Sequence, residues 1–569
     1  MATKDKTTNE LLGFLKERFE LAKTFSTPIH EEARQSLKDY DPEDMDSIYA
    51  GGLKGTRYAI KIPYIFATHA SIQAAFFDGP FNIMFRGKDD DKRRVVEAAH
   101  KYLSEKLNLD EIKDKAAWWF ILTGNCSSNA TFKSIVREEP VINPETGEPL
   151  LDEAGEVVVE SLYDYNDPVV KVDEPTNMFY SPESKFSETG SEIPYFFRVA
   201  YMSPDSIEKI YKEKVEADTN VDGEGDYYSD SKNKVEDLTK TKVYIYQGTL
   251  PSKMKKEVSK LGTWDCDSTY YVIFTKEKIL HKEVVGETDT RFGKMYGSPT
   301  IFNGFGVAKE LRPFQNEISA RRSQQMRMAD LNAFPKMAVD TTTDVDKDAM
   351  LDPRENGVIT YTGQPPSYLT PPDMSNNLIV AEQKAREDAQ FVSGMMDLST
   401  GSQQSTVKTA TGQTIFAEVA ERRIRKDKKN FGRFWKELII LLLKLAQDNW
   451  DDAKTVDIDD QEVTITGADL EGIDFDRDIE VEIESTNVNK EVLRAQVLEM
   501  YGMMKDDQLI NKEELILKAF KDGFNEKSPE RFINEAINPM ATQNPEMMGE
   551  GVPEIPTSQE GMLGGNQQI

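Results

Sequence analysis

The sequence predicts an α+β protein, and three successive blocks of hydrophobic periodicity predict it. Residues 9–125 carry apolar side chains at helical spacing, beginning with ELLGFLKERFELAKTF. From Ala130 the pattern changes to short alternating runs around turn signals such as NPETG and DEAGE. Near Leu311 helical spacing returns, and it continues to about residue 450. At ~100–200 residues per domain, the 569-residue chain has room for three or four structural units.

In the first two blocks the individual elements can be placed from local pattern. Two helices are expected at Lys92–Asn108 and Asp110–Thr123, the second containing Trp118 and Trp119. Strands are expected at Tyr195–Ala200, Lys242–Gln247 and Tyr270–Phe274. One short helix, Pro204–Lys214, is expected among them.

The third block predicts a helix from near Leu311 to about Phe334. We expect this helix to begin close to Pro313, because proline is tolerated only in the first turn. The segment 335–374 is too rich in Pro, Asp, Thr and Gly for a long helix, and a shorter helix, Ser375–Val392, follows it.

The longest predicted helix covers 411–450, which corresponds to roughly 60 Å, with a possible kink at Gly432. Alternating residues in 455–484 predict strands. Two further helices are expected, at Val488–Met504 and from Asn511, and the residues from Asn538 on read as a disordered tail.

The net charge of −30 excludes a surface that binds nucleic acid over its whole extent, because such binding depends on Lys and Arg neutralising phosphates. An acidic protein meets DNA through local basic islands, or it encloses DNA without gripping it. The sequence alone leaves both possibilities open.

No motif in the sequence predicts an enzyme, and we expect no catalytic residue and no cofactor. There is no G-x-x-x-x-G-K-[ST] loop, no G-x-S-x-G and no HExxH, and the four histidines are scattered. Cys126 and Cys266 form no CxxC pair and are expected to be buried thiols. The N-terminus lacks the apolar core of a signal peptide, and the run Leu438–Ala446 is about half of a bilayer span. We therefore expect assembly in the cytoplasm and no membrane contact.

One acidic segment matches part of a calcium-loop template. Its candidate metal ligands fall at positions 1, 3, 5, 9 and 12 and are Asp344, Asp346, Asp348, Asp352 and Glu355. Ala349 stands where the template has glycine, and helical flanks are missing, so a solvated acidic loop is the favoured interpretation.

The order helix, irregular insert, helix, polar gap and very long helix is uncommon. The segment GFGVAKELRPFQNEISARRSQQMRMADLNAFP (304–335) has a Gly-rich entry and a Pro-x-Gln helix start. Together with STVKTATGQTIFAEVAERRIRKDKKNFGRFWKELIILLLKL (405–445) and the segment 172–211, it resembles the portal proteins of tailed bacteriophages.

This resemblance implies a portal-type fold with wing, long stem helices, clip and helical crown, assembled as a ring of commonly twelve copies. The implied parts are the N-terminal wing (1–304), stem helix (305–334), clip (335–374), second stem helix (375–395), tunnel loop (396–410), long kinked helix and β part of the wing (411–487), crown helices (488–537) and disordered tail (538–569).

The same resemblance implies a structural role at one vertex of the virion capsid, in genome packaging and ejection. The implied partners are other copies of the chain, double-stranded DNA bound without sequence preference, the terminase large subunit, the major capsid protein and tail adaptor proteins. Gln403, Gln404 and Lys408 are the candidate residues for transient DNA contact in the tunnel loop.

A basic island on the longest helix is a candidate for ion pairs with 451–484 or for DNA contact, and its residues are Arg422, Arg423, Arg425, Lys426, Lys428, Lys429 and Arg433. On the first stem helix, Arg312, Arg321, Arg322 and Arg327 are expected to pair with the second stem helix of a neighbouring copy, through Glu382, Glu387 and Asp388.

Two other classes of function stay open at this point. One is a phage head–tail adaptor or assembly protein without a DNA channel. The other is a metal-dependent nuclease or hydrolase built on the carboxylate clusters, although no paired Lys or His accompanies them.

Overall fold

The computed structural model of the 569-residue chain describes seventeen stretches of residues. They are 2–45, 53, 56–77, 81–85, 90–140, 159–187, 190–216, 240–249, 269–295, 302–333, 336–342, 344–345, 361–365, 367–369, 376–393, 410–458 and 461–483. The chain divides into two compact units, Met1–Asn487 and Val488–Ile569, and every described residue belongs to the first. The predicted crown helices and C-terminal tail lie outside the described residues.

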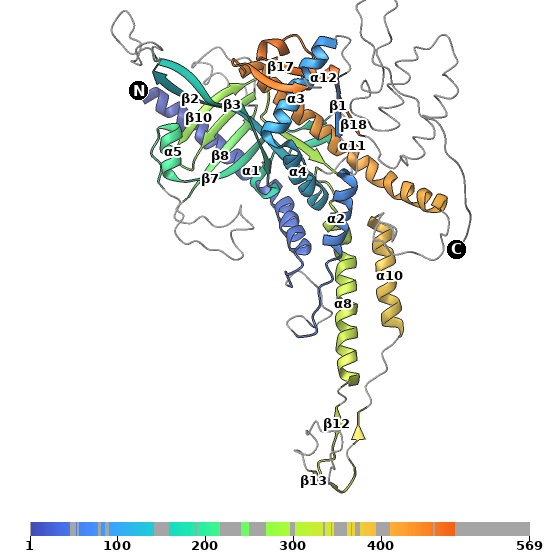
Figure 1. Ribbon diagram of the computed structural model, residues 1–569. Helices are drawn as coiled ribbons and strands as arrows, with labels where there is room; N and C mark the ends of the chain where they lie inside the picture. Colours follow the sequence, from blue (N-terminus) through green and yellow to red (C-terminus); the bar gives the residue numbers. More distant parts are fainter. Residues whose placement is uncertain are drawn as a thin grey trace, which may run out of the picture. The chain divides into compact units, whose positions relative to one another are not determined.

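Helices account for most of the first 125 residues and return after residue 306, as the sequence predicts (Figure 1). The helices are α1 (Ala2–Tyr40), α2 (Tyr64–Phe77), α3 (Asp90–Leu107), α4 (Leu109–Thr123), α5 (Pro204–Tyr211), α8 (Val307–Ala333), α10 (Asn376–Ser393), α11 (Ala410–Asn449) and α12 (Phe475–Asp478), with short 3-10 turns at Pro175–Asn177 and Gly467–Leu470. The predictions for α3, α4, α5, α10 and α11 are confirmed to within a few residues, and α11 stays helical through Gly432.

Two antiparallel sheets occupy the middle of this unit. The larger has the strand order β10 (Ile279–Val285), β9 (Thr269–Phe274), β8 (Thr241–Gly248), β7 (Tyr195–Met202) and β4 (Met178–Tyr180). The smaller has the order β11 (Thr290–Lys294), β2 (Asn125–Pro140) and β3 (Val159–Asp173). Two of the short two-stranded pairs are β5 (Lys185–Ser187) with β6 (Gly190–Glu192), and β16 (Lys454–Ile458) with β17 (Gln461–Ile465).

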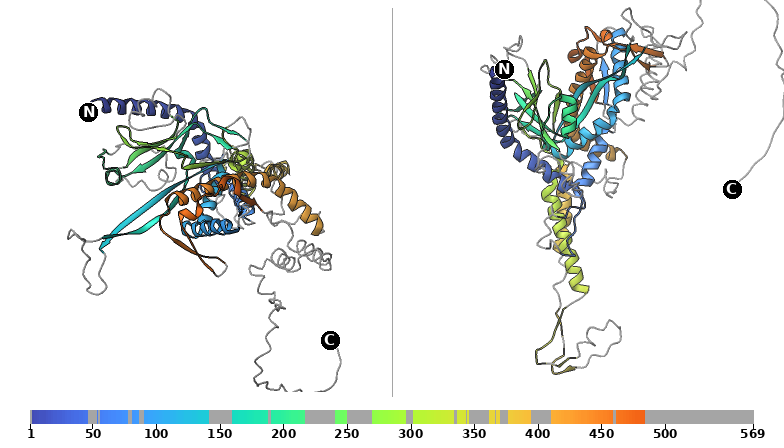
Figure 2. Two further views of the ribbon diagram at one scale, coloured as in Figure 1. Left: turned by 90° about the horizontal axis from the view of Figure 1, so that it is seen from above. Right: turned by 90° about the vertical axis from the view of Figure 1, so that its left-hand side faces the viewer.

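Helix α1 lies over the larger sheet (Figure 2). Its apolar stripe, predicted from the sequence, supplies Leu15 and Phe19, both buried. The Phe19 ring meets the ring of Tyr244 on β8 at 4.7 Å, edge to face. Because one face of an antiparallel sheet must be covered, this contact gives the sheet its own core.

A second and larger core forms where α2, α3, α4 and α11 meet the smaller sheet. Phe120 of α4 and Phe431 of α11 are fully buried, with ring centroids 5.4 Å apart. The apolar run 438–446 at the end of α11 is buried here, apart from the two half-buried residues Lys444 and Leu445. The run is therefore a core segment, in agreement with its short length.

The sequence interpretation missed one strand in the first block. Residues Phe81–Phe85 form β1, which pairs antiparallel with β18 (Ile479–Ile483) in register Phe81↔Ile483. The five residues of this strand, FNIMF, are too few for a periodicity that separates strand from helix, and the partner strand lies about four hundred residues away in the chain. The strands predicted in 455–484 are confirmed as β16, β17 and β18.

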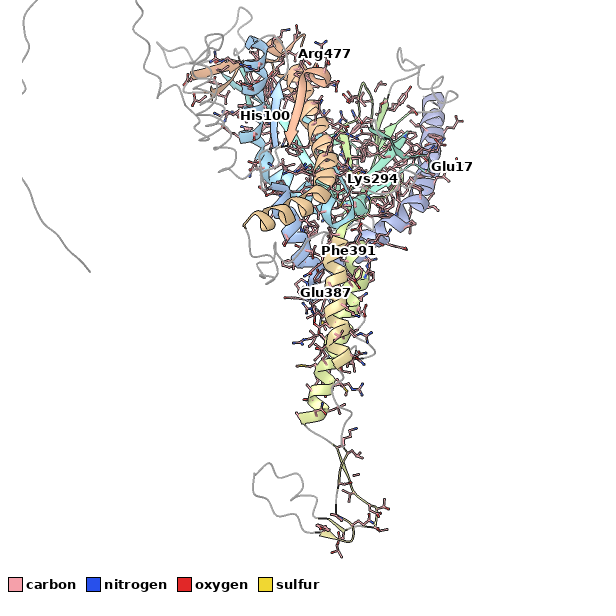
Figure 3. The ribbon with its side chains drawn as sticks, turned by 90° about the vertical axis from the view of Figure 1, so that its right-hand side faces the viewer. Glu17, His100, Lys294, Glu387, Phe391 and Arg477 are labelled. Carbon is pink, nitrogen blue, oxygen red and sulfur yellow. The ribbon has the colours of Figure 1, made fainter. Side chains whose placement is uncertain are left out.

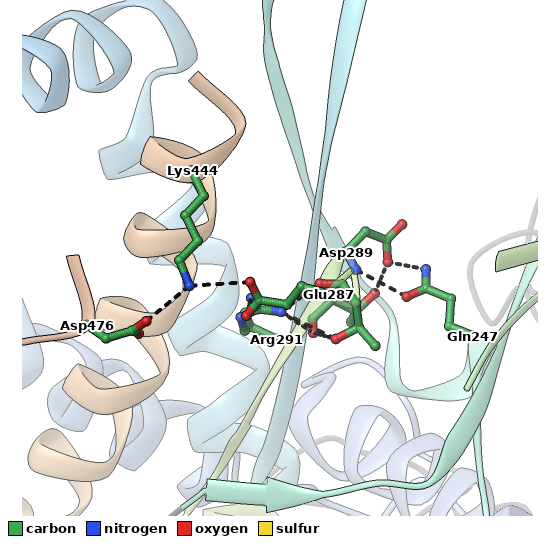
Figure 4. A network of polar contacts seen from close by, with 8 residues as sticks. Gln247, Glu287, Asp289, Arg291, Lys444 and Asp476 are labelled. Carbon is green, nitrogen blue, oxygen red and sulfur yellow. Dashed lines mark hydrogen bonds and ion pairs between the residues drawn. The ribbon is translucent and has the colours of Figure 1, made fainter. Parts of the chain in front are cut away.

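A polar network joins the larger sheet to α11 at the turn between β10 and β11 (Figure 4). Lys444 of α11 donates to Glu287 at 3.4 Å and to Asp476 at 3.1 Å. Two residues farther on in the turn, the Asp289 amide donates to the Gln247 side chain of β8 at 3.1 Å. The turn therefore holds sheet and long helix together through charged hydrogen bonds.

Candidate functional site

The candidate site is the antiparallel pair of α8 and α10 together with the residues that fix it. Gln325 of α8 donates to Glu382 of α10 at 2.8 Å, and Arg386 holds the same carboxylate at 2.8 and 3.1 Å. Ala385 and Ala389 are buried on the same face of α10. Small residues on the contact face let the two helices approach closely.

The segment between these helices forms two short antiparallel ladders (Figure 1). Met337–Ala338 (β12) pairs with Ser367–Tyr368 (β15), and Asp344–Val345 (β13) pairs with Tyr361–Thr362 (β14). The Leu369 amide also donates to the Lys336 carbonyl at 2.7 Å. The chain that leaves α8 thus returns beside itself before α10 begins.

Helix α8 begins earlier than the sequence predicts. It starts at Val307, so Pro313 lies inside the helix and not in its first turn. The expectation was wrong because it considered only the proline, whereas the start is fixed by a tertiary contact of Gly304 and Gly306.

That contact is a crossing of three glycines, Gly124, Gly304 and Gly306. Gly124 follows α4 with φ +85°, and a Cβ on it would lie 2.6 Å from the Gly304 carbonyl carbon and 2.7 Å from the Gly306 nitrogen. Asn125 secures the crossing, since its side-chain oxygen accepts from the Gly304 amide at 3.0 Å. The C-terminus of α4 therefore meets the N-terminus of α8, an arrangement that their dipoles favour.

A buried ion-pair cluster holds α8 to α1. Arg312 pairs with Asp39, whose side chain is 1% exposed, and with Glu32 at 2.6 Å. Next to it, Gln315 donates to the Asp39 carbonyl at 2.9 Å and accepts from the Ile65 amide at 2.9 Å. Burial raises the pKa of Asp39, and Arg312 opposes this shift.

Lys61 closes the cluster from the other side. Its ammonium group is buried and donates to three carbonyls at the end of α1, those of Lys38 (2.7 Å), Asp41 (2.5 Å) and Asp44 (2.9 Å). Cations are favoured at helix C-termini, where carbonyls lack partners. Burial lowers the pKa of this lysine. We call Glu32, Asp39, Lys61, Arg312 and Gln315 the hub.

The hub corrects one sequence expectation. Arg312 was expected to pair with α10 of a neighbouring copy, but it pairs within its own chain with α1. Glu382 likewise pairs within the chain, with Arg386 of its own helix. The sequence carries no signal for the hub, because Arg312 and Gln315 lie about 270 residues from the α1 residues that they contact and make no motif with them. Arg321 also pairs within its own helix, with Glu317 at 3.5 Å. The pairing predicted for Arg322, Arg327, Glu387 and Asp388 stays a prediction.

The predicted DNA-contact residues are only partly described. Gln403, Gln404 and Lys408 lie outside the described residues, as do the side chains of Arg422 and Arg423. Within the island on α11, Arg425, Lys426, Lys429 and Arg433 are exposed, whereas Lys428 is buried. Farther along α11, Lys436 donates to the Asp476 carbonyl at 3.2 Å, so this helix does use lysines to hold the segment 451–484.

Of the predicted calcium ligands only Asp344 is described, and it is exposed in β13. Asp346, Asp348, Asp352 and Glu355 lie outside the described residues. Across the part of the chain that the structure covers, no three His, Cys, Asp or Glu side chains lie close enough to hold a metal ion. In the same residues no helix combines the length and apolarity needed to cross a bilayer.

Three of the described histidines and Cys126 lie in the packed interior of the fold, whereas His281 is exposed on β10 beside Glu283. His30 is buried and contacts the Met178 carbonyl at 2.8 Å, and His69 contacts the Trp118 carbonyl at 3.1 Å. Burial lowers the pKa of His69 and of His100 to about 4, so both are neutral at pH 7 (His100 in Figure 3). Burial raises the pKa of the Cys126 thiol, which makes it a poor nucleophile, and Cys266 lies outside the described residues.

A buried polar cluster lies between the two sheets. Asp173 of β3 accepts from Asn129 at 2.8 Å, and Arg198 of β7 pairs with Asp289 at 3.3 Å. The second carboxylate oxygen of Asp173 has no partner in the described residues. Burial raises the pKa of Asp173 to about 6, against the opposing effects of Arg198 and Asn129. The burial of Asp173 and the nearby Asp289 carboxylate both favour the protonated form of Asp173.

Replacing Asp173 by asparagine should change the pH dependence of stability. A carboxyl with a pKa near 3.9 when unfolded and about 6 when folded costs stability as pH rises from about 4 to 6, on the order of 3 kcal/mol in full. Asp173→Asn lacks this cost. The melting temperature of the variant minus that of the parent should therefore rise between pH 4.5 and pH 7. Asp164→Asn, an exposed position on the same strand, should show no such trend.

What the described residues share is structural: helix joints, a buried polar junction and a helix pair closed by short ladders. The model of the family described as Phage SU10 portal protein matches residues 94–549, four fifths of the chain. The chain belongs to this family and is a portal protein of a tailed phage. A comparison with curated proteins gave no significant match.

Proposed function

We propose that copies of this chain, about twelve, close into a ring at one vertex of the phage capsid, and that the ring forms the channel through which DNA is packaged and ejected. The observation that carries the proposal is the antiparallel pair of α8 and α10, joined by ladders, in a member of the portal family. A closed ring requires a head-to-tail interface repeated around the axis.

In this proposal the parts of the chain keep the roles implied by sequence. The pair α8 and α10 forms the stem around double-stranded DNA, and 335–374 forms the clip, where the terminase large subunit and tail adaptor proteins dock in turn. Residues 396–410 approach the DNA as the tunnel loop, while 488–537 form the crown. The wing, 1–304 and 411–487, faces the major capsid protein.

The charge of the helix pair suits a conduit. Helix α8 carries five basic and three acidic residues, and α10 carries two basic and three acidic, so the pair is nearly neutral in a chain of net charge −30. The negative charge of the chain therefore lies mainly outside this helix pair. A nearly neutral stem attracts the duplex weakly, so DNA can slide.

The outer face of α10 is the proposed contact with the next copy (Figure 3). Val380, Glu387 and Phe391 share the face opposite Ala385 and Ala389, and Phe391 is 70% exposed. Exposed on α8 are Arg322, Met326 and Arg327. An apolar centre flanked by carboxylates on one side and guanidinium groups on the other is complementary.

Charge reversal tests this ring contact. Glu387→Arg together with Asp388→Arg should lower the fraction of protein in rings by about tenfold or more, since facing like charges cost on the order of several kcal/mol. Adding Arg322→Glu and Arg327→Glu should restore rings. Mass photometry and negative-stain images measure both. Glu105→Arg, exposed on α3, is the matched control and should leave rings intact.

The outcome also separates the remaining functions. Rings with a central hole that package DNA support the portal channel. Rods or small oligomers at every salt concentration would support a head–tail adaptor without a channel and contradict the proposal.

A further inference from the structure

A short segment just before α2, residues 56–60, lies along α8, and we call it the strap. The Ile60 amide donates to the Ser323 hydroxyl at 3.0 Å, and the Tyr58 hydroxyl donates to Asp330 at 2.7 Å. Arg57 also pairs with Asp330. Ser323 and Asp330 are seven residues apart on α8, so they share one face, and the strap runs along that face.

Polar contacts hold the strap to α8. Among the described residues, Ile60 is half-buried and belongs to no core cluster, while Tyr58 and Ala59 pack in a small cluster with Leu53. A single hydrogen bond contributes about 1 kcal/mol net, and an exposed ion pair contributes less. Segments with few buried apolar contacts open far more often than the whole protein unfolds. Release of the strap therefore costs little, because water replaces its partners.

The strap has a fixed end at the hub. Lys61 follows Ile60 directly and is held by three carbonyls of the α1 end, and the Ile62 amide donates to Ser319 at 3.1 Å. Helix α8 keeps its contacts with α10 through Gln325, and its N-terminal half keeps its place in the core through Leu311. Opening of residues 56–60 thus frees one side of α8 without unfolding either helix.

We propose that the strap is a releasable clamp on α8. Closed, it holds the part of α8 that carries Ser323 and Asp330; open, it lets the α8–α10 pair shift. The inference rests on the proposed function, in which this pair lines a channel: strap opening lets the channel wall yield as DNA passes. Two discrete arrangements of one element are what a mechanical switch requires.

A reversible disulfide tests the clamp. Ile60→Cys with Ser323→Cys, in a Cys266→Ser background, places two thiols on contacting residues, since the Ile60 amide donates to the Ser323 hydroxyl. Non-reducing electrophoresis measures the fraction of protein in which the disulfide forms. Capsids assembled with this portal variant would be assayed for nuclease-protected DNA, with and without reductant. We expect oxidised capsids to protect at least about tenfold less DNA, and reductant to restore packaging. A merely structural contact would not give this reversal.

The control is Thr455→Cys with Thr464→Cys in the same background, an exposed cross-strand pair of the β16–β17 hairpin. It should package equally well oxidised and reduced. If the oxidised strap variant packages like its reduced form, the clamp is refuted while the channel stands. If unaltered rings fail to package at all, the proposed function fails instead.

Hydrogen exchange on unaltered rings gives a test that needs no variant. The Ile60 amide should exchange at least about a hundredfold faster than the amide of Ile121, which lies in the fully buried part of α4. Equal protection of the two amides would show that the strap opens only on global unfolding and would overturn the inference.

Discussion

Replacing Gly124 by alanine is expected to remove most of the folded, soluble protein. The new Cβ would lie 2.6 Å from the Gly304 carbonyl carbon, 2.7 Å from the Gly306 nitrogen and 2.8 Å from the Phe305 carbonyl carbon. All three are backbone atoms, so no side-chain rotation relieves the clash. Gly124 also has φ +85°, which costs alanine about 1 kcal/mol more.

The displaced segment is the start of α8, so the effect reaches the helix pair. Overpacking of a core commonly costs about 1–3 kcal/mol of stability. A clash between two backbone segments should cost more than this, because neither can move away by a side-chain rotation. We expect Gly124→Ala to lower the melting temperature by several degrees or to abolish soluble expression, measured by differential scanning fluorimetry and by the soluble fraction.

Gly13→Ala is the matched control for this prediction. Gly13 lies inside α1, and a Cβ there meets nothing within 4 Å. Since alanine favours helix by about 1 kcal/mol over glycine, this variant should be at least as stable as the parent. If the Gly124→Ala protein were as stable as the Gly13→Ala protein, the close backbone contact of Gly124 with Gly304 and Gly306 would be contradicted.

The sequence predicts the elements of this fold better than it predicts their joints. The stripes of α1 and α11 are long enough to show a helical period, and the aromatic and β-branched runs of β7, β8 and β9 are equally clear strand signals. Strand β1 was missed, because its five residues are too few to show a period. The start of α8 was misplaced, because Gly304 and Gly306 act through a partner, Gly124, that is 180 residues earlier in the chain.

In the candidate site, too, local features can be predicted from the sequence, whereas contacts between distant residues cannot. Arg322, Glu387 and their neighbours could be proposed as contacts from helical spacing alone, since charge on a helix face is a local property. Lys61 and Arg312 could not be assigned, because each acquires its role only when α1 ends beside α8. A lysine among three carbonyls has no sequence pattern: its partners are backbone atoms, which every residue carries.

Replacing Arg312 by methionine should be the most damaging change within the hub. Methionine keeps the length of the side chain but leaves Asp39, 1% exposed, without its guanidinium partner. Removing one member of a buried pair typically costs about 3–5 kcal/mol, because the other charge stays buried and uncompensated. The variant should therefore melt several degrees lower than the parent at pH 7.5, whereas Lys16→Met, at an exposed position on α1, should change stability by less than about 0.5 kcal/mol.

The pH dependence of the stability of the Arg312→Met variant tests whether Arg312 stabilises the protein through its charge. Burial already raises the pKa of Asp39, and Arg312 is the main group that lowers it, so the variant raises this pKa further. A carboxyl whose folded pKa is raised loses stability as pH increases from its unfolded value, and regains it as pH falls. The stability deficit of Arg312→Met should thus shrink between pH 7.5 and pH 5.

Adding Asp39→Asn to Arg312→Met should recover most of the lost stability at pH 7.5, since the amide can still accept from Gln35. A deficit that stays constant with pH, and that Asp39→Asn does not relieve, would mean that Arg312 acts through packing and not through its charge.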